Sequence, residues 1–184
     1  MGNFVSVMTD EPALRLIVRS HEQAKVAEVL AKCPRLRSDV VPGRNLDAVL
    51  GCLPRLIDGD FTSDEQADGN FFIDLFYEIC GAYAQHRTTQ EIWFDDETFP
   101  EMWAFVWDAR GTPFGLPLSP YGSPAVGYWD DAGVKRFIRT FGELDHAARW
   151  KTAGKNYAEE VGALLDVLRI ADKERKGVYV FYFE

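Results

Sequence analysis

The chain has 184 residues, a formal net charge of −9, 47% hydrophobic residues and three cysteines. This length is enough to bury a core without cross-links, so we expect a single globular domain over residues 1–184. The negative charge repels phosphate backbones and disfavours binding to nucleic acid. No run of 18 apolar residues occurs, so no segment is expected to span a membrane.

The cysteines Cys33, Cys52 and Cys80 are scattered and odd in number, and they form no Cys-x-x-Cys motif. This pattern is typical of buried thiols in a reducing compartment. The N-terminus lacks the basic segment and the long apolar run of a secretion signal, so we expect a cytoplasmic protein. The three histidines have no metal-ligand spacing, and no cofactor motif is present. We therefore predict neither a metal nor a cofactor.

The first third of the chain predicts a strand followed by helices. Residues 4–8 form a short apolar run typical of a strand, and Thr9-Asp10-Glu11-Pro12 has the pattern of a helix start. Helical stripes follow over residues 12–18, 21–33 and 46–53, where Pro34 ends the second helix and Pro54 argues against extending the third.

Residues 70–86 predict the central packing helix. Phe72, Phe76, Ile79 and Tyr83 recur at spacings of four, three and four, which places them on one helical face. Asp68 or Asn70 is a candidate N-cap, because a short side-chain oxygen can accept a free backbone N–H there.

The second half of the chain predicts strands and two further helices. Strands are expected at 92–94, at 102–108, where apolar residues alternate on both faces, and at 114–118 and 178–183. Asp130 or Asp131 is expected to cap a helix that stops at Gly142, and the last helix covers 156–173. The fold class is therefore α+β, with one mixed or antiparallel sheet of about four to six strands packed with about five helices.

Aromatic residues are dense between residues 93 and 129, where tryptophan and tyrosine suggest pockets or interfaces. Two acidic pairs follow such residues, so each predicts an acidic lip for a cationic ligand or a partner rich in arginine and lysine. An acidic turn and a helix cap explain the same residues without a ligand. The candidate binding residues are Trp93, Asp95, Asp96, Tyr121, Tyr128, Trp129, Asp130 and Asp131.

Enzymatic function has little support in the sequence. Phosphate-loop, dinucleotide, zinc-protease and nucleophile-elbow motifs are all missing, so the catalytic residues are unknown and the balance favours a non-enzyme. Asp74 and Glu78, four residues apart, could act as an acid–base pair together with Asp95. Such a pair is more often the solvated side of an amphipathic helix, and this is the explanation we prefer for Asp74 and Glu78.

The opening strand at Phe4–Met8, the helix that follows it, the aromatic helix near the middle and the ending Gly177-Val-Tyr-Val-Phe-Tyr-Phe183 resemble a family of small bacterial proteins with a domain of unknown function. The resemblance implies an α+β fold and a bacterial cytosolic origin. It transfers no catalytic residue to this chain.

These features favour a cytosolic protein that binds a basic protein partner, with an immunity- or antitoxin-like role as one concrete form. The alternative is a small-molecule-binding protein or hydrolase with an aromatic pocket and carboxylates. Either a monomer or a homodimer through a sheet edge fits the sequence.

Overall fold

The computed structural model describes residues 3–37, 46–61, 66–88, 92–94, 100–109, 111–116, 125–153 and 157–183. The chain groups into two compact units. Unit 1 comprises Met1–Asp10, Gln85–Arg110 and Val126–Glu184, and unit 2 comprises Glu11–Ala84 and Gly111–Ala125. The single domain over residues 1–184 stays a prediction, and each unit is described by itself.

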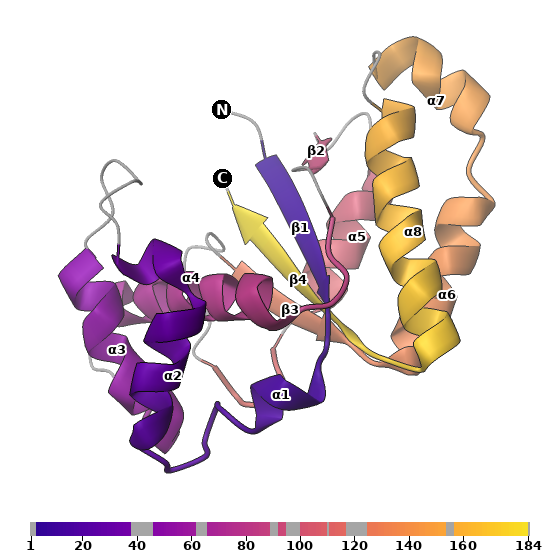
Figure 1. Cartoon of the computed structure of the whole chain (residues 1–184). Coiled ribbons are helices and arrows are strands. Elements are labelled where there is room, and N and C mark those ends of the chain that lie inside the picture. The colour runs from indigo at the N-terminus through magenta and orange to yellow at the C-terminus, as the bar shows by residue number, and fades with distance from the viewer. Residues whose placement is uncertain are drawn as a thin grey trace. The chain divides into compact units, whose positions relative to one another are not determined.

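The sheet of unit 1 has the strand order β2-β1-β4-β3. Its strands are β1 (Asn3–Thr9), β2 (Ile92–Phe94), β3 (Ala125–Trp129) and β4 (Val178–Phe183). β1 pairs antiparallel with β4 from Phe4↔Phe183 to Thr9↔Val178, and with β2 from Asn3↔Phe94 to Val5↔Ile92. The first and last strands of the chain therefore lie side by side (Figure 1).

Four helices belong to unit 1: α5 (Pro100–Asp108), α6 (Asp131–Gly142), α7 (His146–Ala153) and α8 (Tyr157–Glu174). α8 contacts β1, β2, α6 and α7, and α5 contacts β4 and α6 (Figure 1). The buried stripe of α8 includes Val161, Leu164 and Leu168, whose spacing of three and four puts them on one face. On the opposite face of α8, Glu159 and Asp166 are exposed.

Unit 2 is helical in its described part. It contains α1 (Pro12–Arg15), α2 (Ala24–Lys32), a short 3-10 helix (Pro34–Arg37), α3 (Leu46–Asp58) and α4 (Gln66–Tyr83). The predicted central helix is confirmed as α4, which packs against α3, α1 and the 3-10 helix. It begins at Gln66, so the predicted caps Asp68 and Asn70 lie inside the helix.

The α+β class is confirmed, and three of the five predicted strands form. The prediction for residues 102–108 was wrong: they form α5, because apolar residues on both faces satisfy a buried helix as well as a buried strand. Residues 114–116 are not a strand either. Two predicted strands are missing and β3, which was not predicted, is added, so the sheet has four strands where five segments were expected.

The helices exceed the predicted number, since the described residues contain eight α-helices instead of about five. α7 was missed because its apolar pattern is weak. Pro54 did not end α3, which continues to Asp58. The predicted cap at Asp130 is confirmed, because its Oδ1 accepts a hydrogen bond from the Gly133 N–H at 2.9 Å.

Candidate functional site

Three of the predicted binding residues, Asp95, Asp96 and Tyr121, lie outside the described residues. Trp93 is the middle residue of β2, where it pairs with Phe4 of β1. The other four predicted residues are neighbours at the end of β3 and the start of α6. Their contacts show what each does in the fold.

Tyr128 belongs to a hydrogen-bonded cluster around a buried carboxylate. Asp10 is 7% exposed, and its Oδ2 accepts a hydrogen bond from the Tyr128 hydroxyl at 3.2 Å. Its Oδ1 accepts one from the Tyr179 hydroxyl at 3.1 Å, and the two tyrosine rings lie 5.2 Å apart between centroids. Tyr128 thus helps to satisfy a buried acid, which is a structural task.

Trp129 is a core residue, with only 8% of its surface exposed. Its Nε1–H donates to the Phe105 carbonyl oxygen at 2.9 Å, and its ring lies 4.8 Å from the Phe137 ring between centroids. The Arg136 guanidinium lies 4.6 Å from the Trp129 ring centroid. Trp129 therefore joins β3 to α5 and α6.

The two acids after Trp129 serve the start of α6. Asp130 is the N-cap, and Asp131 in the first turn pairs with Lys135 at 2.7 Å between Oδ2 and Nζ. Lys135 also lies 3.9 Å from Asp172 of α8. The explanation as a helix cap accounts for Asp130, and whether this acidic pair also binds a partner stays a prediction.

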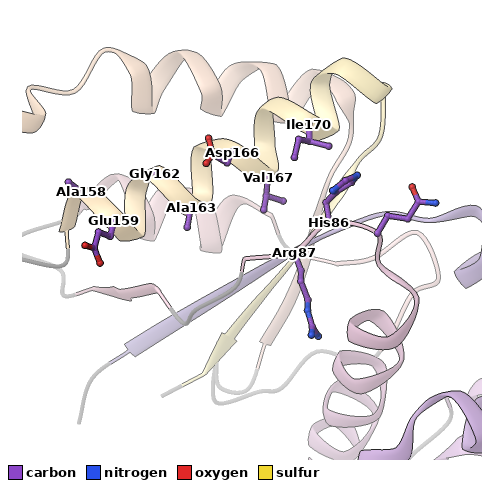
Figure 2. A pocket seen from close by; sticks show the side chains of 10 residues that line it. His86, Arg87, Ala158, Glu159, Gly162, Ala163, Asp166, Val167 and Ile170 are labelled. Atoms are coloured by element: carbon purple, nitrogen blue, oxygen red, sulfur yellow. The ribbon is translucent and has the colours of Figure 1, made fainter.

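A different site emerges along the open face of α8. A groove of about 680 Å³ runs between this helix and the segment 85–87, and both of its walls belong to unit 1 (Figure 2). The part of its lining that α8 contributes is mostly small or apolar. The lining residues are Gln85, His86, Arg87, Ala158, Glu159, Gly162, Ala163, Asp166, Val167 and Ile170.

Backbone hydrogen bonds to β1 fix the second wall. The Thr9 N–H donates to the His86 carbonyl at 2.9 Å, and the His86 N–H donates to Thr9 Oγ1 at 3.3 Å. The Thr88 N–H donates to the Val7 carbonyl at 2.9 Å. The segment is therefore held like a short extra strand, which positions the side chains on it.

His86 stands at one end of the groove and Glu159 at the other. In Figure 2 His86 points toward Ile170 of α8, while Arg87 leaves the same segment in the opposite direction. His86 Nε2 lies 3.5 Å from Glu174 Oε1, and Lys176 Nζ lies 2.8 Å from Glu174 Oε2. The hydrogen bond from Lys176 is the main reason why the pKa of Glu174 is lowered.

The opposite end of the groove is acidic. Glu159 is exposed in the first turn of α8, and Glu160 follows it. Asp166, further along the helix, lies 3.6 Å from Arg169 between Oδ1 and Nη1, and both side chains are exposed. The charge of Asp166 is therefore partly offset, whereas the Glu159 carboxylate forms no ion pair with another residue in the described part of the chain.

Gly162 lies midway along the groove. A Cβ added there would meet nothing within 4 Å, so the packing of this chain does not require glycine at this position. Glycine inside a helix costs about 0.5–1 kcal/mol relative to alanine.

The lining of the groove limits the chemistry that its own side chains can supply. Its lining includes no serine, threonine or cysteine nucleophile and no tryptophan, so it is not the pocket of tryptophans and carboxylates that an enzyme was expected to have. Asp74 and Glu78 of that alternative lie on α4 in unit 2, half-buried. Among the described residues, no group of three or more histidine, cysteine, aspartate or glutamate side chains is placed to hold a metal ion.

Sequence reasoning missed this groove because its walls lie about 75 residues apart in the chain, and local patterns do not reveal such a contact. One signal was available: Ala158, Gly162 and Ala163 keep one face of the last helix small. No protein-family model, curated protein or solved structure matches the chain, which agrees with the resemblance to an uncharacterised family and supplies no ligand or partner. In the described part of the chain, no helix is both long and apolar enough to cross a membrane.

Proposed function

We propose that this protein works by binding a basic segment of a protein partner in the groove along α8. The observation that carries the proposal is the combination, along α8, of small or apolar lining residues with the exposed carboxylates Glu159 and Asp166. The net charge of −9 acts in the same direction, because it attracts a basic partner at long range.

The form of the groove favours a protein segment over a small molecule. A pocket for a small molecule usually encloses its ligand and buries most of the ligand's surface. This groove is instead open along one side of a helix. An immunity- or antitoxin-like role, in which an acidic protein holds a basic one, is a concrete form of this function. The acidic pair Asp130–Asp131 remains a second proposed contact area.

The test is capture of a partner from the lysate of the source cells by the immobilised wild-type chain, compared with three variants. Ala163→Trp fills the groove, Glu159→Lys reverses its acidic end, and Glu143→Lys makes the same charge change at an exposed position outside the lining. We expect the wild-type chain and Glu143→Lys to retain a basic protein, and the two groove variants to lose it. High salt should release this protein from the wild-type chain.

Retention of the same protein by all four chains would place binding elsewhere and overturn the proposal. Failure of the wild-type chain to retain any basic protein at moderate salt would also count against it. Circular dichroism and urea unfolding of each variant show whether a lost interaction reflects a lost fold.

One observation favours the alternative of a ligand-binding protein or hydrolase. His86 lines the groove, and its Nε2 lies 3.5 Å from Glu174 Oε1, an arrangement that can orient an imidazole for proton transfer. A thermal-shift screen of metabolites separates the two functions: a ligand that stabilises wild type but not His86→Asn supports the alternative.

A further inference from the structure

The residues that α8 contributes to the groove share one face of that helix. Glu159, Asp166 and Ile170 are seven and four residues apart, so they lie close to one line along the helix axis. Gly162 and Ala163 lie on the same face between the two carboxylates. A Cβ added at Gly162 would meet nothing within 4 Å. The smallest side chains of the face therefore lie at its centre, between two exposed carboxylates.

This lining is poorly suited to an extended peptide. A peptide that binds as a strand takes its affinity from hydrogen bonds to a neighbouring backbone. Seven of the ten described lining residues belong to α8, and the backbone groups inside a helix bond to one another. On the other wall, the N–H and the carbonyl of His86 are both bonded to Thr9.

A helix is better suited to the same lining. A proline-rich segment docks in a groove lined by aromatic residues, and the described lining contains no phenylalanine, tyrosine or tryptophan. An α-helix satisfies its own backbone hydrogen bonds, so it needs only side-chain contacts from the groove. Among the common modes of peptide recognition, a helix laid in a groove therefore agrees best with the lining along α8.

The two carboxylates determine where such a helix must carry its charges. Seven positions separate Glu159 from Asp166, which is about 10.5 Å along α8. A second helix packed at the common angle of about 20° runs nearly along α8, so basic residues seven apart on it can meet both carboxylates. Small residues at the contact allow the two axes to approach to about 8 Å. Arg169 already offsets part of the Asp166 charge, so Glu159 should contribute more.

We infer that the basic segment bound along α8 is an amphipathic α-helix. Its small residues pack against Gly162 and Ala163, and its lysine or arginine side chains, seven residues apart, pair with Glu159 and Asp166. The inference rests on the function proposed above and deepens it, because it adds the conformation and the charge spacing of the partner segment.

Three synthetic peptides of about 18 residues, a length at which an isolated helix can form, test this inference. The first is rich in alanine and glutamine and carries two lysines seven residues apart. The second moves one lysine by two positions, to the opposite helical face, and the third is the first with a central proline. All three have the same charge, so attraction by the acidic chain as a whole acts on them equally.

The affinity of each peptide for the full chain is measured by NMR titration at low salt. We expect the first peptide to bind about two- to fivefold more tightly than the second, as exposed ion pairs allow. It should bind about tenfold more tightly than the third, or better, because proline breaks the helix.

Variants of the protein make the result specific to the groove. Gly162→Leu should weaken the first peptide by about tenfold, because the new side chain occupies the centre of the face. Gly51→Leu, at a helical glycine that also meets nothing within 4 Å, is the matched control and should leave the affinity unchanged. Glu159→Gln should weaken the first peptide about two- to fivefold, whereas Glu143→Gln, at an exposed position outside the lining, should not. Circular dichroism shows whether each variant is folded.

Equal affinities of the first and third peptides for wild type would overturn the inference, because the bound segment would then not be a helix. Absence of binding by every peptide at about 1 mM, or binding that Gly162→Leu leaves unchanged, would also overturn it. The proposed function is decided separately by the capture experiment. A basic partner that wild type retains and Ala163→Trp loses would leave that function standing even where the helix is refuted.

Discussion

The Tyr179 hydroxyl in β4 donates a hydrogen bond at 3.1 Å to Asp10, the residue immediately after β1. The Asp10 N–H in turn donates to the Gly177 carbonyl at 2.9 Å. These bonds close the end of the β1–β4 pair where the chain leaves β1. The first and last strands are thereby joined through side chains as well as through their ladder.

This relationship predicts the effect of removing the buried acid. Asp10→Ala should lower the free energy of unfolding by about 1–3 kcal/mol, because two tyrosine hydroxyls lose their acceptor. Tyr179→Phe should cost about 1 kcal/mol, since it removes one bond and keeps the ring. Urea unfolding measures both. A Tyr179→Phe variant more damaging than Asp10→Ala would contradict this account.

Gly177 should not tolerate alanine. An added Cβ would lie 2.2 Å from the Tyr128 hydroxyl oxygen and 2.7 Å from the Trp129 carbonyl oxygen, and the backbone contact cannot move aside easily. We expect Gly177→Ala to destabilise the fold by about 1–3 kcal/mol. Gly162→Ala is the matched control, which should stabilise it by about 0.5–1 kcal/mol. Thermal unfolding measures both variants, and a shift of the melting temperature in the same direction for Gly177→Ala and Gly162→Ala would refute the prediction.

Asp130 offers a way to separate a cap from a binding residue. Asp130→Ala removes the acceptor of the Gly133 N–H and should cost about 1 kcal/mol of stability. Asp130→Ser keeps a capping oxygen while it removes the charge, so most of that stability should return. If partner binding falls equally with both variants although Asp130→Ser is stable, then Asp130 also contributes its charge to recognition.

Alkaline unfolding should depend on Tyr83. Burial is the main reason why its pKa is raised from 10.0 to about 12. The unfolded chain ionises this hydroxyl first, so Tyr83 stabilises the fold fully below pH 10 and this contribution is lost as the pH rises toward 12. Tyr83→Phe should therefore flatten the fall in stability over this range. The free energy of unfolding is measured by urea unfolding at several pH values between 10 and 12. If it falls with pH as steeply in Tyr83→Phe as in wild type, Tyr83 is not the residue responsible.

The sequence by itself determined those helices and strands whose apolar residues favour one type of secondary structure over the other. Residues 4–8 and 178–183 form strands because both are short apolar runs rich in β-branched or aromatic residues, and α4 forms a helix because its aromatic residues recur at spacings of three and four. Asp130 could be predicted as a cap because capping depends only on the next three residues.

Only the tertiary structure decided the rest. Residues 102–107 are all apolar, so the spacing of apolar residues there fits a buried strand and a buried helix alike. In the structure they belong to α5, in which the rings of Trp103 and Trp107 stack with their centroids 5.3 Å apart. Trp129 was predicted as a binding residue, yet it packs against Phe105 and Phe137 and is buried. The groove joins residues 85–87 to α8, and such a contact depends on packing between distant segments that no local pattern encodes.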